Sequence, residues 1–429
     1  MLPFVAKTGR LVSIKKNYRV SPRTVSIGFS TLLLISTCLA GTALPAAEPS
    51  VWIEFLGQPS LTASEFTVSA GALHIPGAKD VTVPLAEVVS ISMRRQEPIS
   101  GEQPTSLIWL SNGDRLAAVP TAVDEETLTC RWVSYPDSEP LRIPLEFVTI
   151  IAPALPTARQ RRLELLRELA LDPQTKDDLA WLISGDRVAG EFTGLEAGEY
   201  LMTTNSGPLP IRRDKLLALR FAAELVTAVK PAERREVISL TDGSRITATQ
   251  FEFNAERLQL TTFWGDECTL PASAFAEMHV ASPRIAWLTE QTPERFEHTP
   301  YVGGDWPLTT DRNVRHGPLM VRDRECAFGF GVHSQSEIVY KLTLQDREFQ
   351  AEIGIDDVAE GAGSAVFIVR VDDRDVWSSG EVTGSTPMIS IPAIPLDKAK
   401  RLTLRVEFGE LGDVRDVANW CHPVLLRTP

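Results

Sequence analysis

The stretch Gly329-Phe-Gly-Val-His-Ser-Gln-Ser336, followed by Ile338-Val-Tyr-Lys-Leu342, decides the fold. Its apolar side chains alternate with small or polar ones, which is the period of two expected for a β-strand with one buried face. The chain also has 30 prolines, 27 glycines and many short runs of Val, Ile and Thr. This composition favours short strands joined by turns, so the sequence predicts an all-β fold.

Further blocks of the same texture follow this stretch toward the C-terminus. They are Phe349-Gln-Ala-Glu-Ile-Gly-Ile-Asp-Asp357, Gly363-Ser-Ala-Val-Phe-Ile-Val-Arg-Val-Asp372, Val376-Trp-Ser-Ser-Gly380, Leu402-Thr-Leu-Arg-Val-Glu-Phe-Gly409 and Gly412-Asp-Val-Arg-Asp-Val-Ala-Asn-Trp420. In this order the blocks resemble the NPCBM carbohydrate-binding module associated with family 98 glycoside hydrolases, over about residues 299–427. The resemblance implies a non-catalytic jelly-roll β-sandwich that binds sugars through its loops, with galactose-type residues as ligands of some members.

The alternation also predicts which side chains of this module face inward. The predicted core residues are Phe328, Phe330, Val332, Ile338, Tyr340, Ile353, Ile355, Val366, Ile368, Leu402, Leu404 and Val406. Asp416 and Trp420 lie four residues apart before the last strand. We expect them to form a buried structural clasp, in which the carboxylate accepts hydrogen bonds from backbone amides and the indole covers the end of the sandwich.

Sugar recognition needs an aromatic face for the pyranose ring and a few fixed polar groups for its hydroxyls. The candidate ligand-binding residues outside the alternating core are Trp306, Arg315, His333, Asp356, Asp357 and Trp377, with Arg312 and His316 as further candidates. A hydrogen-bonded structural role is an equal alternative for His333. Asp356 and Asp357 either cap a local turn, which we prefer, or hold a structural calcium ion; no other cofactor is expected.

The cysteines and histidines give no transition-metal pattern. No cysteine pair has Cys-x-x-Cys spacing, and the histidines are scattered through the sequence at His74, His279, His298, His316, His333 and His422. We therefore expect no metal site and no histidine cluster. Within the NPCBM-like module, Cys326 and Cys421 lie on strands that often neighbour each other in a sandwich, so a disulfide between them and two separate thiols are equal alternatives. Cys130 and Cys268 are expected to be unpaired.

The first half of the chain repeats a strand, a tight turn and a second strand. The hairpin copies are residues 107–116, 179–188 and 237–246, with Gly113, Gly185 and Gly243 at the turn. A closing run that begins at a proline follows each copy, at Pro144, Pro210 and Pro271, and Pro84 marks a degenerate first copy. A period of about sixty residues suits small β-barrel-like units. The order of the runs resembles Sm-like or SH3-like barrels.

One helix interrupts these repeats. Thr157 and Gln160 have capping-box spacing, and Leu163, Leu166 and Leu169 share one predicted apolar face. Its basic face is predicted to be solvated and carries Arg159, Arg161, Arg162 and Arg167. The predicted order is a signal peptide at 1–47, a degenerate first repeat at 48–98, a second repeat at 99–156, a connecting helix at 157–172, a third repeat at 173–230, a fourth repeat at 231–285, a linker at 286–298 and the sandwich at 299–429.

The N-terminal segment reads as an export signal. Residues 1–26 contain six basic and no acidic side chains, and an apolar run spans residues 27–39 before a zone of small residues. A retained anchor and lipidation at Cys38 are the less favoured alternatives. Beyond residue 47 the chain has 37 basic against 56 acidic residues. This charge excludes nucleic acid and anionic membranes as expected partners, and we expect a secreted, periplasmic or cell-surface protein.

The sequence also lacks common catalytic motifs. Gly-x-Ser-x-Gly, His-Glu-x-x-His and the phosphate-binding loop are absent from the chain. We therefore predict an exported, non-catalytic carbohydrate-binding protein. The alternatives are a scaffold protein whose C-terminal sandwich binds another protein and, less favoured, an unrecognised glycan-active enzyme.

Overall fold

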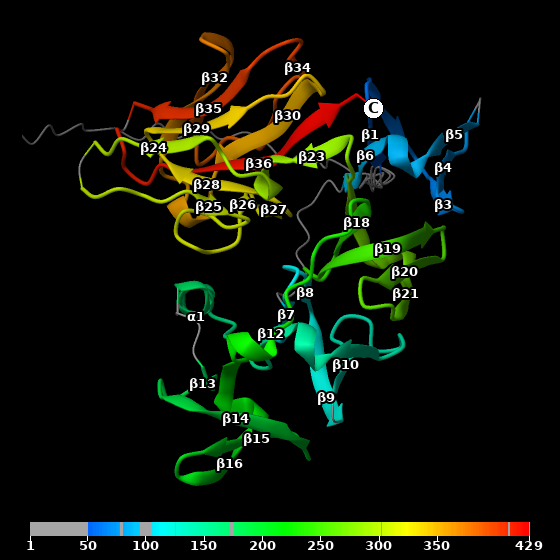
Figure 1. Cartoon of the computed structure of the whole chain (residues 1–429), viewed down its shortest axis with the longest axis vertical. Helices are drawn as coiled ribbons and strands as arrows, with labels where there is room; N and C mark the ends of the chain where they lie inside the picture. The colour runs from blue at the N-terminus through cyan, green and yellow to red at the C-terminus, as the bar shows by residue number, and fades with distance from the viewer. Residues whose placement is uncertain are drawn as a thin grey trace, which may run out of the picture. The chain divides into compact units, whose positions relative to one another are not determined.

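The computed structural model describes residues 50–77, 80–94, 104–124, 126–171, 176–301, 303–410 and 412–428. Its fold is all-β, which confirms the predicted fold class (Figure 1). The predicted signal peptide and Cys38 lie outside the described residues. Among the residues that the structure describes, no helix has the length and apolar character needed to cross a membrane.

Four groups of short strands make up the first half of the described chain. The first contains β1 (Ser50–Phe55), β2 (Gln58–Ala63), β3 (Thr67–Ser69), β4 (Ala72–Ile75), β5 (Val81–Pro84) and β6 (Val88–Arg94). The second contains β7 (Leu107–Leu110), β8 (Arg115–Leu116), β9 (Ala118–Asp124), β10 (Thr127–Trp132), β11 (Leu141–Pro144) and β12 (Val148–Ala152). The third contains β13 (Asp178–Leu182), β14 (Arg187–Glu196), β15 (Glu199–Thr204), β16 (Gly207–Arg212) and β17 (Leu216–Arg220). The fourth contains β18 (Arg235–Leu240), β19 (Arg245–Phe253), β20 (Arg257–Thr262), β21 (Glu267–Pro271) and β22 (Phe275–Ala281).

Each group closes because its first strand pairs with its last. The antiparallel pairs are β1 with β6, β7 with β12, β13 with β17, and β18 with β22. The closing strands also pair between groups, β6 with β22 and β12 with β17. The first and fourth groups therefore share a ladder, as do the second and third.

The turn glycines and the closing runs have the same geometry in each copy. Gly113, Gly185 and Gly243 have φ values of 90°, 93° and 85°, a left-handed conformation that glycine adopts at little cost. A short 3₁₀ turn precedes each closing strand: η1 (Leu85–Glu87), η2 (Leu145–Phe147), η3 (Arg213–Lys215) and η5 (Ala272–Ala274). Arg212, rather than the predicted Pro210, stands directly before η3. The third copy thus keeps the turn without the proline.

The helix α1 (Arg159–Leu171) buries a different face from the one predicted. Its buried side chains are Arg162, Leu165 and Leu169, spaced three and four residues apart along one stripe. Arg162 donates a hydrogen bond to the Pro104 carbonyl at 2.9 Å, which compensates the burial of its charge. The prediction of a wholly solvated basic face is therefore wrong at Arg162.

The C-terminal strands form a sandwich of two antiparallel sheets. The strands are β23 (Ile285–Trp287), β24 (Arg295–His298), β25 (Thr309–Thr310), β26 (Met320–Val321), β27 (Arg324–Glu325), β28 (Gly329–His333), β29 (Ser336–Lys341), β30 (Asp346–Ile355), β31 (Ser364–Val371), β32 (Arg374–Thr383), β33 (Ile389–Ser390), β34 (Ile394–Pro395), β35 (Arg401–Phe408) and β36 (Val417–Arg427). One sheet runs β25-β28-β36-β30-β33, with β23 on β36 and β34 on β30, and the other runs β24-β29-β35-β31-β32. β26 and β27 pair with each other in a separate two-stranded sheet.

The remaining short turns are η4 (Ala223–Leu225), η6 (Leu288–Glu290) and η7 (Asp357–Ala359). The sandwich begins earlier than the sequence predicts, because β23 pairs with β36 and β24 pairs with β29. Residues 286–298, predicted as a linker, therefore supply strands of both sheets.

The sandwich core contains most of the predicted inward-facing residues, but one strand has the opposite register. In β31 the buried side chains are Ala365, Phe367 and Val369, whereas Val366 and Ile368 are half-buried. The prediction for Val366 and Ile368 is wrong because this run is apolar at every position, so a period of two cannot choose its face. Phe328 is buried in the core that the sandwich shares with the repeats rather than between the two sheets.

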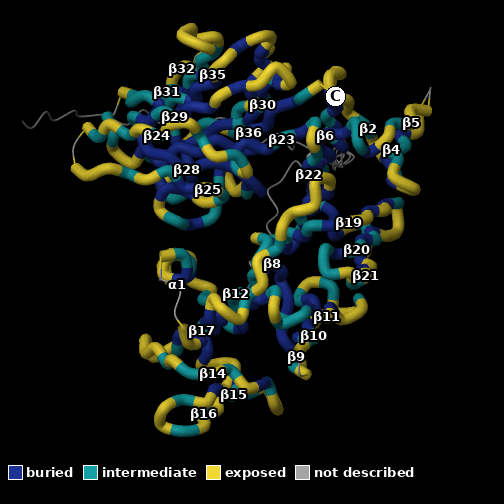
Figure 2. Tube along the Cα trace, viewed as in Figure 1, coloured by how far each residue is buried: buried dark blue, intermediate teal, exposed yellow. Residues whose placement is uncertain are grey.

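The last strand, β36, is buried on both faces. All its residues from Val417 to Leu426 are buried (Figure 2). Trp420 and Leu425 pack inside the sandwich, whereas Val424 and Leu426 belong to the core of the repeats. The sandwich and the fourth repeat are therefore joined through a continuous apolar contact.

Candidate functional site

An aromatic stack lies at the end of β28. The indole of Trp306 packs flat on the imidazole of His333, with centroids 4.9 Å apart and an interplanar angle of 7°. His333 is buried, and its Nδ1 donates to the Ser334 carbonyl at 3.0 Å. Trp306 is only half-buried, so part of its ring remains accessible. Two of the predicted candidates thus form a stacked pair, called the platform below, whose ligand-binding role stays a prediction.

His298 holds this platform in place, although the sequence analysis did not select it. The Trp306 backbone N–H donates to His298 Nδ1 at 3.1 Å, and His298 Nε2 donates to the Ser334 carbonyl at 3.2 Å. Both rings thereby converge on one carbonyl. His298 escaped the prediction because residues 286–298 were assigned to a linker.

Arg315 lies on a loop that packs against β28. Its side chain is exposed, and its backbone N–H donates to Asn313 Oδ1 at 3.0 Å. Burial is the main cause that lowers the pKa of His333, and the Arg315 charge contributes to the lowering. The loop lies close to β28 because Gly331 has no side chain: a Cβ there would lie 2.4 Å from the Arg312 carbonyl oxygen. Arg315 thus offers exposed hydrogen-bond donors on a loop that packs against the strand of His333.

Asp356 supports the loop from within the protein. Its carboxylate is 1% exposed and accepts from Asn313 Nδ2 at 3.0 Å and from the Met320 N–H at 2.9 Å. It also accepts from Asn419 Nδ2 at 2.6 Å and from the Val358 N–H at 2.9 Å. Burial raises the pKa of Asp356 to about 6. The side chain is enclosed by donors, so it positions the Arg315 loop instead of facing solvent.

Asp357 and Trp377 lie away from the stack. Asp357 accepts from the backbone N–H groups of Arg322 and Asp323, both at 2.8 Å, and so fixes the turn between β26 and β27. Trp377 lies on β32, whereas His298 lies on β24, at the opposite edge of the same sheet. Of the six candidates, Trp306 and His333 are in contact, and Asp356 is linked through Asn313 to the loop that carries Arg315.

The predicted clasp residues are both completely buried. Asp416 accepts from Ser334 Oγ at 2.5 Å and from the Ser364 N–H at 2.9 Å. Burial raises the pKa of this carboxyl to about 6. Trp420 lies edge-on to Phe367 in the sandwich core, with centroids 5.3 Å apart. Asp416 therefore holds Ser334, whose carbonyl accepts hydrogen bonds from His298 and His333.

Cys326 and Cys421 form a disulfide, with Cα atoms 5.7 Å apart. The bond links the residue directly after β27 to β36. Cys130 and Cys268 are buried and form no disulfide within the described part of the chain. Burial raises the pKa of Cys268 to about 12 and also raises the pKa of Cys130.

The expectation that no histidines cluster is wrong. Besides His298 and His333, the rings of His279 and His422 stack with centroids 4.4 Å apart, beside Glu277. Burial lowers the pKa of His279 and favours its neutral form. The spacing of these residues in the sequence gave no signal, because the fold brings β22 and β36 together.

Comparison with known protein families identifies the region that contains the sandwich. Residues 284–426 match the family described as "NPCBM/NEW2 domain". The match confirms the resemblance predicted from the sequence and begins one residue before β23. It does not include the repeats, so their resemblance to Sm-like or SH3-like barrels stays a prediction.

One curated relative is a Renibacterium salmoninarum protein named "Putative endo-alpha-N-acetylgalactosaminidase", 32% identical over 98 residues. These residues are 23% of this chain and 6% of the relative, so the chain spans a small part of it.

Solved structures that resemble the chain include CBM51 modules. One is from Clostridium perfringens GH95 in complex with methyl-galactose, with 24% identity, a TM-score of 0.30, and coverage of 33% of this chain and 99% of that one. Another is the CBM51-2 module with GlcNAc and INT domains of Clostridium perfringens ZmpB, with 20% identity, a TM-score of 0.31, and coverage of 44% and 43%. A third is the tandem CBM51 modules of a Streptococcus pneumoniae family 98 glycoside hydrolase, with 12% identity, a TM-score of 0.30, and coverage of 59% and 89%.

Proposed function

We propose that this chain is an exported, non-catalytic protein that binds glycans through its C-terminal sandwich. The ligand is a galactose-type sugar on a cell surface or in the extracellular or periplasmic space. The observation that carries the proposal is the Trp306–His333 stack, inside a region that matches the NPCBM/NEW2 family, with Arg315 exposed on the loop that packs against β28.

The chemistry of the stack suits a neutral sugar. The apolar face of a pyranose ring packs on an indole, and a guanidinium donates to ring hydroxyls. His333 supports the indole from below, so little ordering of Trp306 is needed when a sugar binds. The acidic excess of the chain beyond residue 47 disfavours anionic ligands and leaves neutral glycans as suitable partners.

A glycan array probed with the labelled full chain tests the proposal. Binding to galactose-type glycans is expected, and the Trp306→Ala variant should weaken it about tenfold or more, as for an aromatic anchor of an interface. Arg315→Ala should weaken it in the same direction. The matched control is Trp377→Ala, because Trp377 is a half-buried tryptophan at the opposite edge of the sheet from His298.

Two outcomes would contradict the proposal. If Trp306→Ala and Trp377→Ala lost glycan affinity equally, the binding site would not be at the Trp306–His333 stack. An array on which the folded wild-type chain binds no glycan would reject sugar binding and favour the scaffold alternative, in which the sandwich binds protein.

A further inference from the structure

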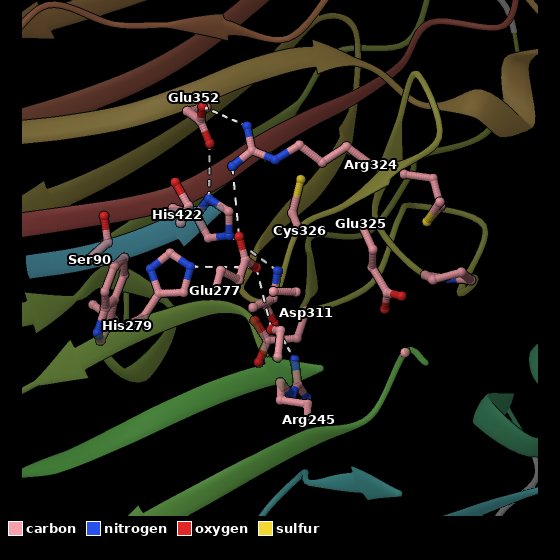
Figure 3. Close-up of a pocket in the computed structure, with 18 of the residues that line it drawn as sticks. Ser90, Arg245, Glu277, His279, Asp311, Arg324, Glu325, Cys326, Glu352 and His422 are labelled. Atoms are coloured by element: carbon pink, nitrogen blue, oxygen red, sulfur yellow. Dashed lines mark hydrogen bonds and ion pairs between the residues drawn. The ribbon is translucent and has the colours of Figure 1, made fainter. Parts of the chain in front are cut away.

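A second polar cluster lies where the fourth repeat meets the sandwich, apart from the Trp306 platform. Glu277 and His279 are two residues apart on β22, so their side chains point to the same face of that strand. His422 projects from β36 toward them. One ligand atom from each of the three residues lies within 4.8 Å of the other two (Figure 3).

His279 is the member of this cluster whose polar atoms are least satisfied. The residue is 5% exposed, and neither ring nitrogen has a hydrogen-bond partner among the described residues. The nearest carboxylate oxygen, on Glu277, is 3.6 Å from Nε2. A buried donor or acceptor without a partner costs about 1–3 kcal/mol. A ligand that binds the imidazole lone pair would remove part of that cost.

A β-bulge turns His422 toward the cluster. The pairing of β30 with β36 shifts register between Gln350 and Glu352, and His422 has a φ of 49°. Bulges commonly re-aim a side chain in this way. His422 Nδ1 donates to Glu352 at 3.1 Å. A carboxylate that accepts from one ring nitrogen is the usual arrangement behind a metal-binding histidine.

The other nitrogen of His422 accepts from the Ala327 N–H at 3.2 Å. Metal binding at this nitrogen would replace that long hydrogen bond with a metal–nitrogen bond. The ion would have to offset the lost hydrogen bond of the Ala327 N–H through its bonds to His279 and Glu277, whose nearest atoms stand 3.6 Å apart.

The charges around the cluster favour a divalent cation. Glu54, Glu277 and Glu352 contribute three negative charges, and Arg324 contributes one positive charge, 3.2 Å from Glu352 and 3.8 Å from Glu277. The local excess is two negative charges. Glu277, His279 and His422 also line one cavity, so an ion has a path to them.

We propose that Glu277, His279 and His422 form a binding site for a divalent transition-metal ion such as Zn²⁺. Two imidazoles and one carboxylate are a donor set that suits zinc, whereas calcium and magnesium prefer oxygen ligands alone. Because β22 belongs to the fourth repeat and β36 to the sandwich, the ion would link the two. The inference does not rest on the proposed sugar binding.

Zinc titration of the purified, chelator-treated full chain tests the site. The wild type should bind one equivalent of Zn²⁺, measured by competition with a chromophoric chelator and by elemental analysis. His279→Gln should weaken binding at least 100-fold, and Glu352→Gln about 10- to 100-fold because it removes the carboxylate behind His422. The matched control is His74→Gln, which replaces a histidine of the first repeat that contacts Thr82 and should leave Zn²⁺ affinity unchanged.

A second measurement does not depend on how the variants fold. Co²⁺ added to the wild-type chain should give the intense visible absorption of a tetrahedral nitrogen and oxygen site, and Zn²⁺ should displace it. The proposal is overturned if the wild type binds no Zn²⁺ at micromolar concentration, or if His279→Gln and His74→Gln, both folded by circular dichroism, bind equally. If His279→Gln does not fold, the Co²⁺ spectrum together with His422→Gln decides.

Discussion

Substitution of Asp356 tests whether this buried carboxylate supports the loop that carries Arg315, as distinct from contacting the ligand. Replacing Asp356 with alanine removes four hydrogen bonds at once. Two of the donors are the side-chain amides of Asn313 and Asn419, which are 2% and 0% exposed. Water cannot readily replace the lost acceptor for these two amides. In the variant they therefore stay buried without a partner, or the loop that carries Asn313 and Arg315 opens to let water in.

The expected loss follows from these donors. An unsatisfied buried donor costs about 1–3 kcal/mol, and part of the total is returned because a buried carboxylate no longer has to be desolvated. The net decrease in the free energy of unfolding should be about 3 kcal/mol for Asp356→Ala. Since Asn313 shapes the loop that carries Arg315, glycan binding should weaken as well.

Asp357→Ala is the matched control, because the neighbouring carboxylate accepts from two exposed backbone N–H groups. Water replaces that acceptor, so the expected loss is about 1 kcal/mol or less. Urea unfolding followed by tryptophan fluorescence measures both variants. Equal decreases in the urea midpoint, or a decrease below about 1 kcal/mol for Asp356→Ala, would refute the assignment of Asp356 as the support of this loop.

Three further predictions concern the stability of the sandwich. Burial raises the pKa of Asp416 to about 6, so the folded chain takes up a proton between pH 7 and 5 that the unfolded chain does not. As the pH falls from 7 to 5, the free energy of unfolding of the wild type should therefore rise by about 1 kcal/mol relative to Asp416→Asn. Urea unfolding at the two pH values measures the difference, and no rise would contradict the prediction. Reduction of the Cys326–Cys421 disulfide should lower the free energy of unfolding by about 3–5 kcal/mol, measured with and without a reductant, and an unchanged urea midpoint would contradict it. Phe367→Ala should lower the free energy of unfolding by about 3–5 kcal/mol and Val366→Ala by about 1 kcal/mol or less, because only Phe367 is fully buried. If chemical unfolding gave the larger loss for Val366→Ala, the register predicted from the sequence would be correct.

Local sequence pattern was sufficient for the sandwich and insufficient for parts of its register. The run Gly329 to His333 alternates, and the structure places Phe330 and Val332 of β28 in the core between the sheets as predicted, although the other residues of the strand are buried as well. The run Ala365 to Val369 is apolar throughout, so only the packing of the opposite sheet decides that Phe367 faces inward. A residue's face is predictable where the neighbours differ in polarity and unpredictable where they do not.

Some residues of the candidate site were likewise predictable from the sequence and others were not. Trp306 and His333 could be selected because their residue types suit a sugar, and the structure stacks them. His298 could not, because its role depends on β24 lying beside β29. His279 and His422 meet only when β22 and β36 are brought together, and no spacing in the sequence encodes that contact. Residue type suggests chemistry, but long-range strand contacts decide which residues share a site.

The double burial of β36 determines where the sandwich can be cut from the rest of the chain. A fragment that begins at residue 299 lacks β23, which pairs with β36, and β24, which pairs with β29. It would also expose Val424 and Leu426, which pack in the core of the repeats. Exposed strand edges and apolar side chains of this kind favour aggregation. Glycan binding is therefore best assigned on the full chain, since failure of the shorter fragment would report lost strands and not a missing sugar site.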